Sequence, residues 1–315
     1  MNSDVHSLQE IHFRAMGSDC HIVILGGDPE QLSTAEGEVR RLESLWSRFK
    51  PDSEISRLNS AVGKPTIVSS ETIAILCRAL RAHRLTDGWF DPFMGRDLAS
   101  LGYDRDFEKL LGSDKQIAGT RSYALTLSDS GVVATSRRDY STFSIDLVNR
   151  AVTLPNGVDF DPGGIGKGLG ADHVSRFILA GRARGALVNL GGDLRCRGDH
   201  PEDGWQVTIE NPLDPQGTLD EFIRIKDGAI ATSTPLKRNW AQGDGTRMHH
   251  LLSPGTRTPA EVEIASATVI APSGWQAEML AKALLLAGPQ IGVPLLRKHR
   301  AAGVVVTLDG SVVQL

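Results

Sequence analysis

Several features that would assign this 315-residue chain to a specialised class of protein are missing from its sequence. Its only cysteines, Cys20, Cys77 and Cys196, lie far apart without metal-ligand spacing, which argues against a disulfide framework and against a structural zinc site. We interpret them as buried small hydrophobic residues. No apolar run approaches the roughly 20 residues that a helix needs to cross a bilayer, so membrane insertion is not expected.

An excess of positive charge is also lacking, because 34 Lys and Arg face 38 Asp and Glu, for a formal net charge of −4. This balance predicts no nucleic-acid partner, since binding to phosphate backbones needs a basic surface. Residues 1–17 carry neither a basic start nor an apolar stretch of signal-peptide length, which predicts a cytoplasmic protein. With 40% hydrophobic and 23% charged residues, the chain is expected to fold around a sizeable core.

The residue that the sequence has in excess is glycine. Its 33 glycines make up about a tenth of the chain, above the usual roughly 7%, and they occur in clusters. Clustered glycines indicate places where the backbone bends sharply or comes close to another group. Two of these clusters, at 163–168 and 191–192, are therefore candidate binding segments.

Hydrophobic periodicity favours an α+β fold with mixed or antiparallel sheets and packed helices, because helices and strands mingle without a strict βαβ rhythm. No linker rich in proline or serine divides the chain, so we predict one compact unit over residues 1–315, with residues 1–10 as a flexible N-terminus. Strands are predicted at 21–25, 125–127, 143–147, 185–190, 205–210, 222–225, 268–271, 302–308 and 311–315, and helices at 30–49, 55–59, 69–86, 167–181 and 275–287.

The first candidate site is the segment DPGGIGKG at 161–168, at the start of a predicted helix. Glycines let backbone N–H groups approach an anion, the helix start adds positive partial charge, and Lys167 supplies a mobile cation, so the segment suits a phosphate. It matches neither the P-loop nor the dinucleotide-binding fingerprint. A tight turn with a solvated lysine is the alternative interpretation.

Two further segments carry polar groups. Residues 189–193, Asn-Leu-Gly-Gly-Asp, end a predicted strand in paired glycines, and taken alone they are interpreted as a turn. Residues 231–233, Ala-Thr-Ser, and the pair His249 and His250 supply hydroxyls and imidazoles that could orient a ligand or move a proton. No Gly-x-Ser-x-Gly elbow supports a serine hydrolase, and adjacent histidines diverge on a strand, which disfavours a two-histidine metal centre.

Taken in order and spacing, these segments resemble the ApbE family of FAD:protein FMN transferases. The resemblance runs from Met16 to about Gly288. It is carried by AMGS at 15–18, LWSRFKPDSEISRLN at 45–59, TDGWFDP at 86–92, DPGGIGKGLGAD at 161–172, residues 188–193, ATS at 231–233 and His250 before Pro254. The succession of these motifs is more specific than any one of them. It implies an ApbE-like fold with T-fold-like halves.

The resemblance implies a transferase that binds FAD and, with magnesium, moves its FMN half as a phosphodiester onto a threonine of a target flavoprotein, releasing AMP. An FAD-binding carrier or regulatory module without transfer activity, or an FAD hydrolase, are the alternatives. By position, His250 and Lys167 would be catalytic. The FAD-binding residues that the resemblance implies are Met16, Asp91, Gly163, Gly164, Ile165, Gly166, Lys167, Asn189, Gly191, Gly192, Asp193, Thr232, Ser233 and His250.

The chain departs from the family at the implied magnesium site, where the usual Ala-Asp-Ala-x-x-Thr reads Ala-Glu-Met-Leu-Ala-Lys over residues 277–282. Glu278 and the carbonyl of Gly166 can still ligate the ion, but the charged amine of Lys282 cannot and would compete with it. The alternative is that Lys282 extends into solvent. We therefore predict weak or absent magnesium binding. Ser253 and Thr234 also replace the family's usual Asp and Gly.

Overall fold

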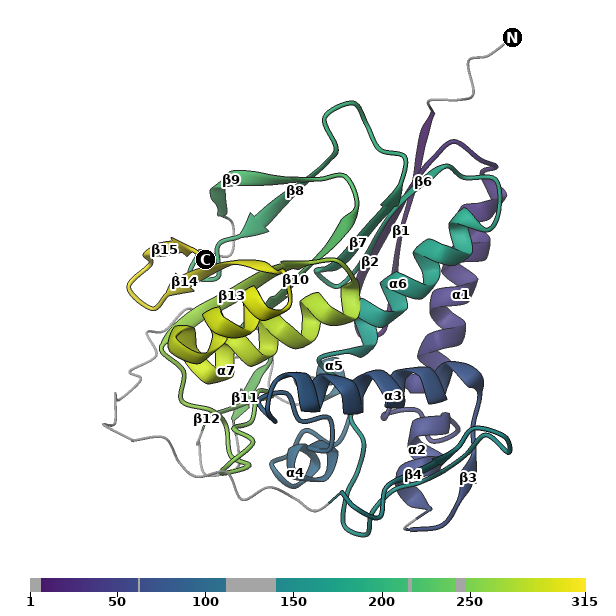
Figure 1. Ribbon diagram of the computed structural model, residues 1–315, viewed down its shortest axis with the longest axis vertical. Helices are drawn as coiled ribbons and strands as arrows, with labels where there is room; N and C mark the ends of the chain where they lie inside the picture. Colours follow the sequence, from purple (N-terminus) through teal and green to yellow (C-terminus); the bar gives the residue numbers. More distant parts are fainter. Residues whose placement is uncertain (1–6, 62, 112–139, 215–216, 242–246) are drawn as a thin grey trace.

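The computed structural model describes residues 7–61, 63–111, 140–214, 217–241 and 247–315 (Figure 1). These residues form the predicted α+β arrangement, in which antiparallel sheets carry packed helices. The strand predicted at 125–127 lies outside the described residues.

One antiparallel sheet of eight strands runs through the molecule in the order β1-β2-β6-β7-β10-β13-β14-β15. The pairing of β7 (Asp193–Gly198) with β10 (Gly228–Ser233) joins two four-stranded halves, consistent with the T-fold-like halves that the resemblance implies. The other strands are β1 (Leu8–Ala15), β2 (Ser18–Leu25), β6 (Gly185–Leu190), β13 (Ile264–Ala271), β14 (Ala302–Thr307) and β15 (Val312–Gln314).

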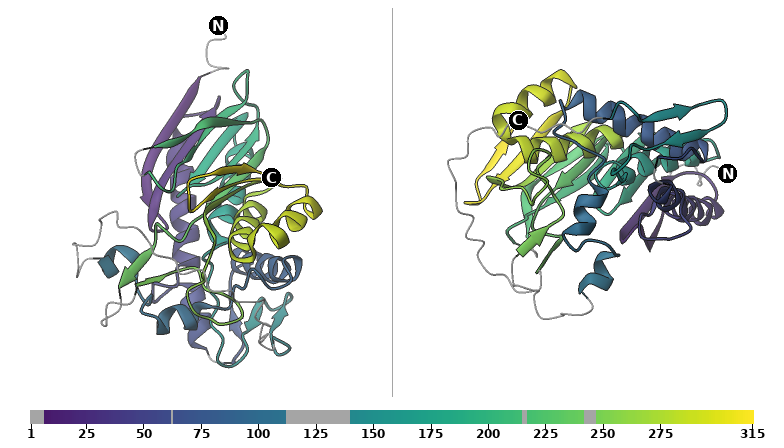
Figure 2. Two further views of the ribbon diagram at one scale, coloured as in Figure 1. Left: turned by 90° about the vertical axis from the view of Figure 1, so that its left-hand side faces the viewer. Right: turned by 90° about the horizontal axis from the view of Figure 1, so that it is seen from below.

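Helices cover one face of this sheet. α6 (Gly166–Leu179) packs on β6 and β7, α7 (Gly274–Lys298) packs on β10 and β13, and α1 (Glu30–Trp46) lies beside α6. α3 (Ser70–Leu85) crosses below α6 and α7 in Figure 1, and the two further views of Figure 2 show the helices and the sheet as separate layers.

Alternate strand residues point into two separate cores, as the two-residue period of a strand requires. Ile22 of β2 faces the helices and joins the main core, whereas Val23 faces the other side. That second side is covered by the hairpin of β8 (Trp205–Glu210) and β9 (Thr218–Ile225). The parity of a residue in its strand therefore decides whether its side chain can reach α6 and α7.

Short elements complete the fold around α3 and beside the sheet. Sequence periodicity did not predict α4 and α5, because each has too few residues for a helical repeat to be recognised. The short elements are α2 (Glu54–Ser60), α4 (Gly95–Ser100), α5 (Phe107–Leu111), β3 (Thr66–Ile67), β4 (Ser144–Asp146), β5 (Ala151–Thr153), β11 (Asn239–Ala241) and β12 (Arg247–His249).

Most long elements match their predictions. β6 and β8 have the predicted bounds, and the side chain of Ser69 caps α3 by accepting the N–H of Thr72 at 3.2 Å. Two predictions are wrong in part. Residues 8–10, predicted as flexible, begin β1, where Leu8 pairs with Leu25. Cys20 and Cys196 are buried as predicted, but Cys77 is exposed because it faces away from the packed side of α3.

α7 is the one helix among the described residues that is long and apolar enough to cross a membrane, judged by length and composition only. Half of its most apolar window is buried inside the protein, where Met279 and Leu280 belong to the main core. Gly288, at φ 71° and ψ 170°, interrupts the helix. In this fold α7 therefore serves as a core helix.

Candidate functional site

The glycine loop, residues 161–168, leads from a buried extended segment into the first turn of α6. Asn59 fixes the start of the loop, because its side chain exchanges two hydrogen bonds with the backbone of Phe160, at 2.8 and 2.9 Å. Gly164 has φ 101°, a conformation that residues with a side chain rarely adopt. The glycine at this position is therefore required by the backbone itself.

The glycine loop offers fewer free backbone N–H groups to a phosphate than its sequence predicts. Five of its N–H groups already donate to acceptors within the protein: those of Asp161, Gly163, Ile165, Gly166 and Gly168. Within the described residues, the N–H groups of Gly164 and Lys167 are left without an acceptor. A pyrophosphate here would depend on lysine side chains more than on a ring of backbone donors.

The first turns of α6 and α7 touch through two glycines. A Cβ added to Gly168 would lie 2.2 Å from the carbonyl oxygen of Gly274, so neither position admits a side chain without backbone movement. Asp172 secures the contact by accepting the first two N–H groups of α7 at 3.0 and 3.1 Å, and it pairs with buried Arg195 at 3.3 Å. This contact brings Glu278 against the start of α6.

Two buried carboxylates, Glu278 and Asp193, lie next to the glycine loop. Each residue is only 6% exposed, and burial raises the pKa of both carboxyl groups. The charge of Asp193 raises the pKa of Glu278 further. Lys167 Nζ lies 3.7 Å from Asp193 Oδ2 and opposes these shifts, while Glu278 Oε2 accepts the N–H of Gly168 at 2.7 Å. A desolvated carboxylate pair of this kind favours a nearby cation.

Lys282 points into this cluster and not into solvent. Its Nζ donates to the carbonyl of Gly163 at 3.3 Å and lies 5.6 Å from the ring centroid of Phe90. Burial lowers the pKa of Lys282, and three carboxylates oppose that shift: Asp161, Glu278 and Asp91. The alternative in which Lys282 extends away from the site is thereby excluded in this structure.

The donor set fits magnesium only in part. Glu278 and the carbonyl of Gly166 are oxygen ligands of the type that magnesium prefers. Lys282 stands where the resemblance implies a threonine hydroxyl. Its ammonium has no lone pair and already donates to a carbonyl oxygen of the glycine loop. The residues of this chain therefore do not complete the three-ligand set.

His250 differs from its neighbour His249 in having a ring nitrogen available. Nδ1 of His250 lies 3.2 Å from the carbonyl of Arg238, which can only accept, so Nδ1 carries the proton and Nε2 keeps its lone pair. Nε2 has no partner in the described part of the chain. His249 instead accepts a backbone N–H at Nδ1 (3.3 Å) and donates from Nε2 to the carbonyl of Ala260 (3.1 Å), so both its nitrogens are used.

The surroundings of His250 keep its imidazole neutral. Burial lowers its pKa well below the ordinary value of 6.5, and the positive charges of Arg238 and Lys282 lower it further. Its hydrogen bond to the Arg238 carbonyl opposes the shift without reversing it. A neutral imidazole with a free Nε2 is equipped to take a proton from a hydroxyl group.

Sequence reasoning missed two arginines at the site. Arg238 follows β10 in no motif, and its Nη2 lies 3.4 Å from Ser18 Oγ. Arg48 belongs to the segment 45–59 that carries the resemblance, and its Nε lies 3.5 Å from Asp161 Oδ1. Nη2 of Arg48 is buried and has no hydrogen-bond partner among the described residues. A buried donor without an acceptor beside the glycine loop suits an anionic ligand.

The two predicted residues on β10 face opposite sides of the sheet. Ala231 packs into the core under α7, so Ser233, two residues on, shares that face. Thr232 points to the other side, where its Oγ1 lies 2.8 Å from Oγ1 of Thr268. The side chain of Thr232 therefore does not join the charged cluster.

The predicted turn after β6 is held by its own polar groups. Oδ1 of Asn189 accepts the N–H of Gly192 at 2.8 Å, and Gly191 and Gly192 have φ of 67° and 95°. Asn189 faces away from the helices because it alternates with buried residues of the main core. Lys167 connects this turn with the charged cluster at the glycine loop, because its Nζ would lie 3.4 Å from a Cβ added to Gly191.

Met16 and Asp91 border the cluster from two other loops. Met16 stands at φ 53° in the β1–β2 turn, and its N–H donates to Glu43 Oε1 at 3.0 Å. Asp91 accepts the hydroxyl of Tyr140 at 2.7 Å and the N–H of Phe93 at 2.9 Å, one at each carboxylate oxygen. In this structure Asp91 thus holds its own loop in place, near the charge of Lys282.

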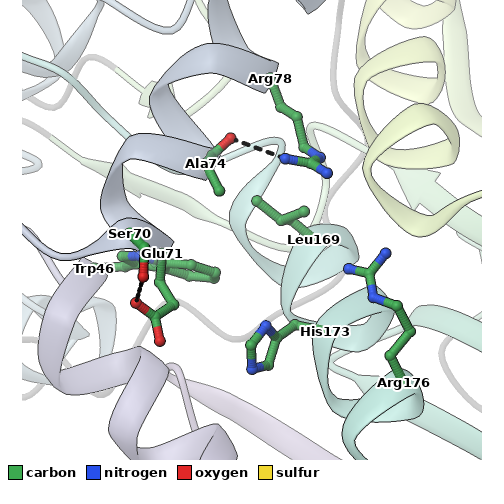
Figure 3. Close-up of a pocket in the computed structure, with 8 residues that line it drawn as sticks. All are labelled: Trp46, Ser70, Glu71, Ala74, Arg78, Leu169, His173 and Arg176. Carbon is green, nitrogen blue, oxygen red and sulfur yellow. Dashed lines mark hydrogen bonds between the residues drawn. The ribbon is translucent and has the colours of Figure 1, made fainter. Parts of the chain in front are cut away.

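A separate hollow of about 250 Å³ lies between α1, α3 and α6 (Figure 3). It shares no residue with the set predicted from the sequence, because Leu169, His173 and Arg176 line it from another face of α6. Arg78 reaches toward it from α3 and donates to the carbonyl of Ala74 at 3.3 Å. The hollow is therefore distinct from the charged cluster at the glycine loop.

Known proteins similar to this chain share one description. The model of the ApbE family matches residues 16–306. The chain is 28% identical over 272 residues to the FAD:protein FMN transferase of Escherichia coli (strain K12), an alignment that covers 85% of this chain and 74% of that protein. It is 29% identical over 268 residues to the FAD:protein FMN transferase of Vibrio cholerae, covering 82% and 75%.

Solved structures share the fold over nearly the whole chain. The crystal structure of the ApbE protein from Thermotoga maritima superposes with a TM-score of 0.81 at 26% identity, covering 98% of this chain and 97% of that one. The flavin transferase ApbE from Vibrio cholerae superposes with a TM-score of 0.74 at 21% identity, again over 98% and 97%. The second likeness concerns the fold alone.

Proposed function

The chain belongs to the ApbE family, and from this membership we propose that it is an FAD:protein FMN transferase. In this reaction the FMN half of FAD passes as a phosphodiester to an acceptor hydroxyl, and AMP leaves. The observation that carries the proposal is the gathering of Lys167, Lys282 and a neutral His250 around the glycine loop. Cations for a pyrophosphate and a base for a hydroxyl are thus found at one site.

Lysine side chains would supply most of the charge that a diphosphate needs. Lys167 lies between the glycine loop and the turn at Gly191, and Lys282 lies on the carbonyl of Gly163. Because phosphoryl transfer spreads negative charge over the phosphate oxygens, cations held near that position lower the barrier. Arg48, whose Nε lies 3.5 Å from Asp161 Oδ1, adds a further cation beside the loop.

His250 would act as the general base. Its Nδ1 proton is held by the carbonyl of Arg238, so Nε2 is the atom that takes the proton of the acceptor hydroxyl. We propose a threonine of a target flavoprotein as that acceptor. A hydrolase would use water in its place with the same base, so only the product distinguishes the two activities.

We propose that magnesium binds weakly to this chain. When bound in the family's position, the ion would neutralise phosphate charge, and Glu278 with the Gly166 carbonyl would hold it. Lys282 stands where the third ligand would be and brings its own positive charge. The ammonium of Lys282 therefore takes over part of the charge neutralisation.

Calorimetry with FAD and FMN tests the binding half of the proposal. We expect FAD to bind more tightly than FMN, because the site is proposed to recognise both halves of the dinucleotide. Incubation with FAD, with and without magnesium, should then release AMP. Equal affinity for the two flavins, or no binding of either, would overturn the proposal; binding without AMP or transfer would favour the carrier interpretation.

The proposed cytoplasmic location can be tested separately. Fractionation of cells that express the full chain should recover the protein with the cytoplasmic markers. Recovery in a membrane or extracytoplasmic fraction would contradict this part of the proposal and leave the chemistry of the site unaffected.

A further inference from the structure

A second cluster of metal-ligating side chains lies on β1 and β2, on the face of the sheet that is turned away from α6. Glu10, His12 and His21 each offer one ligand atom, and these atoms all lie within 4.8 Å of one another. Nε2 of His21 lies 2.8 Å from Glu10 Oε2, and Nε2 of His12 lies 3.9 Å from the same oxygen. The proposed transferase chemistry uses none of these residues.

Strand geometry explains why the three side chains meet. His12 and His21 are direct partners in the antiparallel register of β1 and β2, and Glu10 is two residues from His12, so all three project from one face. Their imidazole rings stack with centroids 4.0 Å apart and an angle of 8° between the planes. The register of two paired strands fixes the backbone positions of the three residues, and the exposed rings turn from this stacked arrangement to direct both Nε2 lone pairs at one ion.

The electrostatic surroundings of the cluster favour an added cation. Within the described residues, the two histidines are the ion-pair partners of Glu10, and no lysine or arginine neutralises it. The nearest residue of positive charge on the same face of β1, Arg14, is engaged by Asp19 at 2.8 Å and by Glu108. A divalent ion at the three ligand atoms would therefore meet one carboxylate and no competing guanidinium.

We propose that Glu10, His12 and His21 form a surface site for zinc or a similar late first-row divalent ion. Two imidazoles and one carboxylate are ligands that zinc takes in three-ligand protein sites, with water free to complete the coordination. The ion replaces the hydrogen-bonded proton between His21 and Glu10. Zinc bonds of about 2.0–2.1 Å require ligand atoms roughly 3.3 Å apart, so the 2.8 Å contact lengthens and the 3.9 Å contact shortens.

The site would tie the edge strand of the large sheet to its neighbour. β1 pairs with β2 alone, because it is the first strand in the sheet order. An ion bound across the two strands stabilises the folded hairpin in proportion to the logarithm of the ion concentration above its dissociation constant. His12 and Glu10 are 68% and 60% exposed in their side chains, so an ion can reach the site from solvent.

Titration of the purified, metal-free full chain with zinc chloride tests the proposal. We expect one zinc ion per chain, a zinc-dependent rise in Tm, and a loss of affinity of about tenfold or more in each of His12→Ala, His21→Ala and Glu10→Gln. Magnesium should not compete, since it prefers oxygen ligands. The matched control is His173→Ala, because His173 contacts Glu38 at 2.6 Å without a third ligand.

Three results would overturn the proposal: no zinc binding by the unmodified chain, equal zinc binding by the three variants, or an equal loss in His173→Ala. Circular dichroism of the variants checks that they fold. FMN transfer from FAD, measured in parallel, should be the same in His12→Ala as in the unmodified chain. The zinc site and the proposed transferase function can therefore fail independently.

Discussion

The two histidine groups of this chain differ in their neighbours more than in their own chemistry. His250 is half-buried beside the positive charges of Arg238 and Lys282, which lower the pKa of its imidazole and disfavour a further cation nearby. His12 and His21 stand on an exposed hairpin beside a carboxylate, where a cation is favoured. Nearby charge and burial therefore decide whether an imidazole in this chain serves as a base or as a ligand.

The largest effect should come from removing the imidazole of His250. His250→Ala should reduce the rate of FMN transfer by about 10²- to 10⁴-fold with little change in FAD affinity, because a general base is lost. The unmodified enzyme should lose activity only as the pH falls through the folded-state pKa of His250, which lies below 6.5. Initial rates across a pH series measure both. A variant with the wild-type rate would show that His250 is not the base.

The site around His250 depends on the contact between the backbones of α6 and α7. Gly168→Ala should destabilise the fold by about 1–3 kcal/mol, since the added Cβ would lie 2.2 Å from the Gly274 carbonyl oxygen. Gly37→Ala is the matched control, because a Cβ at Gly37 of α1 has nothing within 4 Å. The control should be stabilised by up to about 1 kcal/mol. Urea unfolding measures the two; equal stabilities would contradict the contact.

Replacing the ammonium of Lys282 by a hydroxyl group should favour magnesium binding next to the glycine loop. Lys282→Thr is expected to strengthen magnesium binding about tenfold or more and to raise AMP release, because a ligand replaces a competing charge. Magnesium titration in the presence of FAD is the measurement. Tight magnesium binding by the unmodified protein, unchanged in Lys282→Thr, would show that the two cations do not compete.

The smallest expected effect concerns the second neighbour of His250. In Arg238→Met the positive charge that disfavours the imidazolium is gone, so the pKa of His250 should rise and the acid limb of the pH–rate profile should move to higher pH. The Arg238 carbonyl still orients Nδ1. The measurement is the pH–rate profile of FMN transfer, recorded for the unmodified chain and for Arg238→Met under the same conditions. An acid limb that stays in place would mean that the charge of Arg238 does not lower the pKa of His250.

The fold was predictable where an apolar strand ends at a glycine turn, as β6 does at Gly191 and Gly192. The strand β10 was not predicted. Its alternation of side chains, which places Ser233 on the face toward α7 and Thr232 on the opposite face, was therefore missed as well. A motif places both residues at the site but does not encode which side of a sheet each faces. Short helices such as α4 and α5 lack the length for a periodic signal.

The candidate site was predictable in its residues and less so in their roles. Glycines of the loop were interpreted as room for a phosphate, but Gly168 is needed for contact with Gly274, a partner distant in the sequence. Arg238 stands in no motif, and its influence on His250 follows only from three-dimensional proximity. Such long-range contacts are a property of the fold, which local patterns do not contain.

The most direct test of the central claim is flavin transfer to a protein. The full chain, FAD and a flavoprotein that carries an acceptor threonine are incubated, and AMP is measured together with the mass of the acceptor. We predict AMP in equal amount to covalently bound FMN, with both lost in His250→Ala and in an acceptor whose threonine is replaced by alanine. Bound FAD without AMP, or AMP without modified acceptor, would contradict the assignment as an FAD:protein FMN transferase.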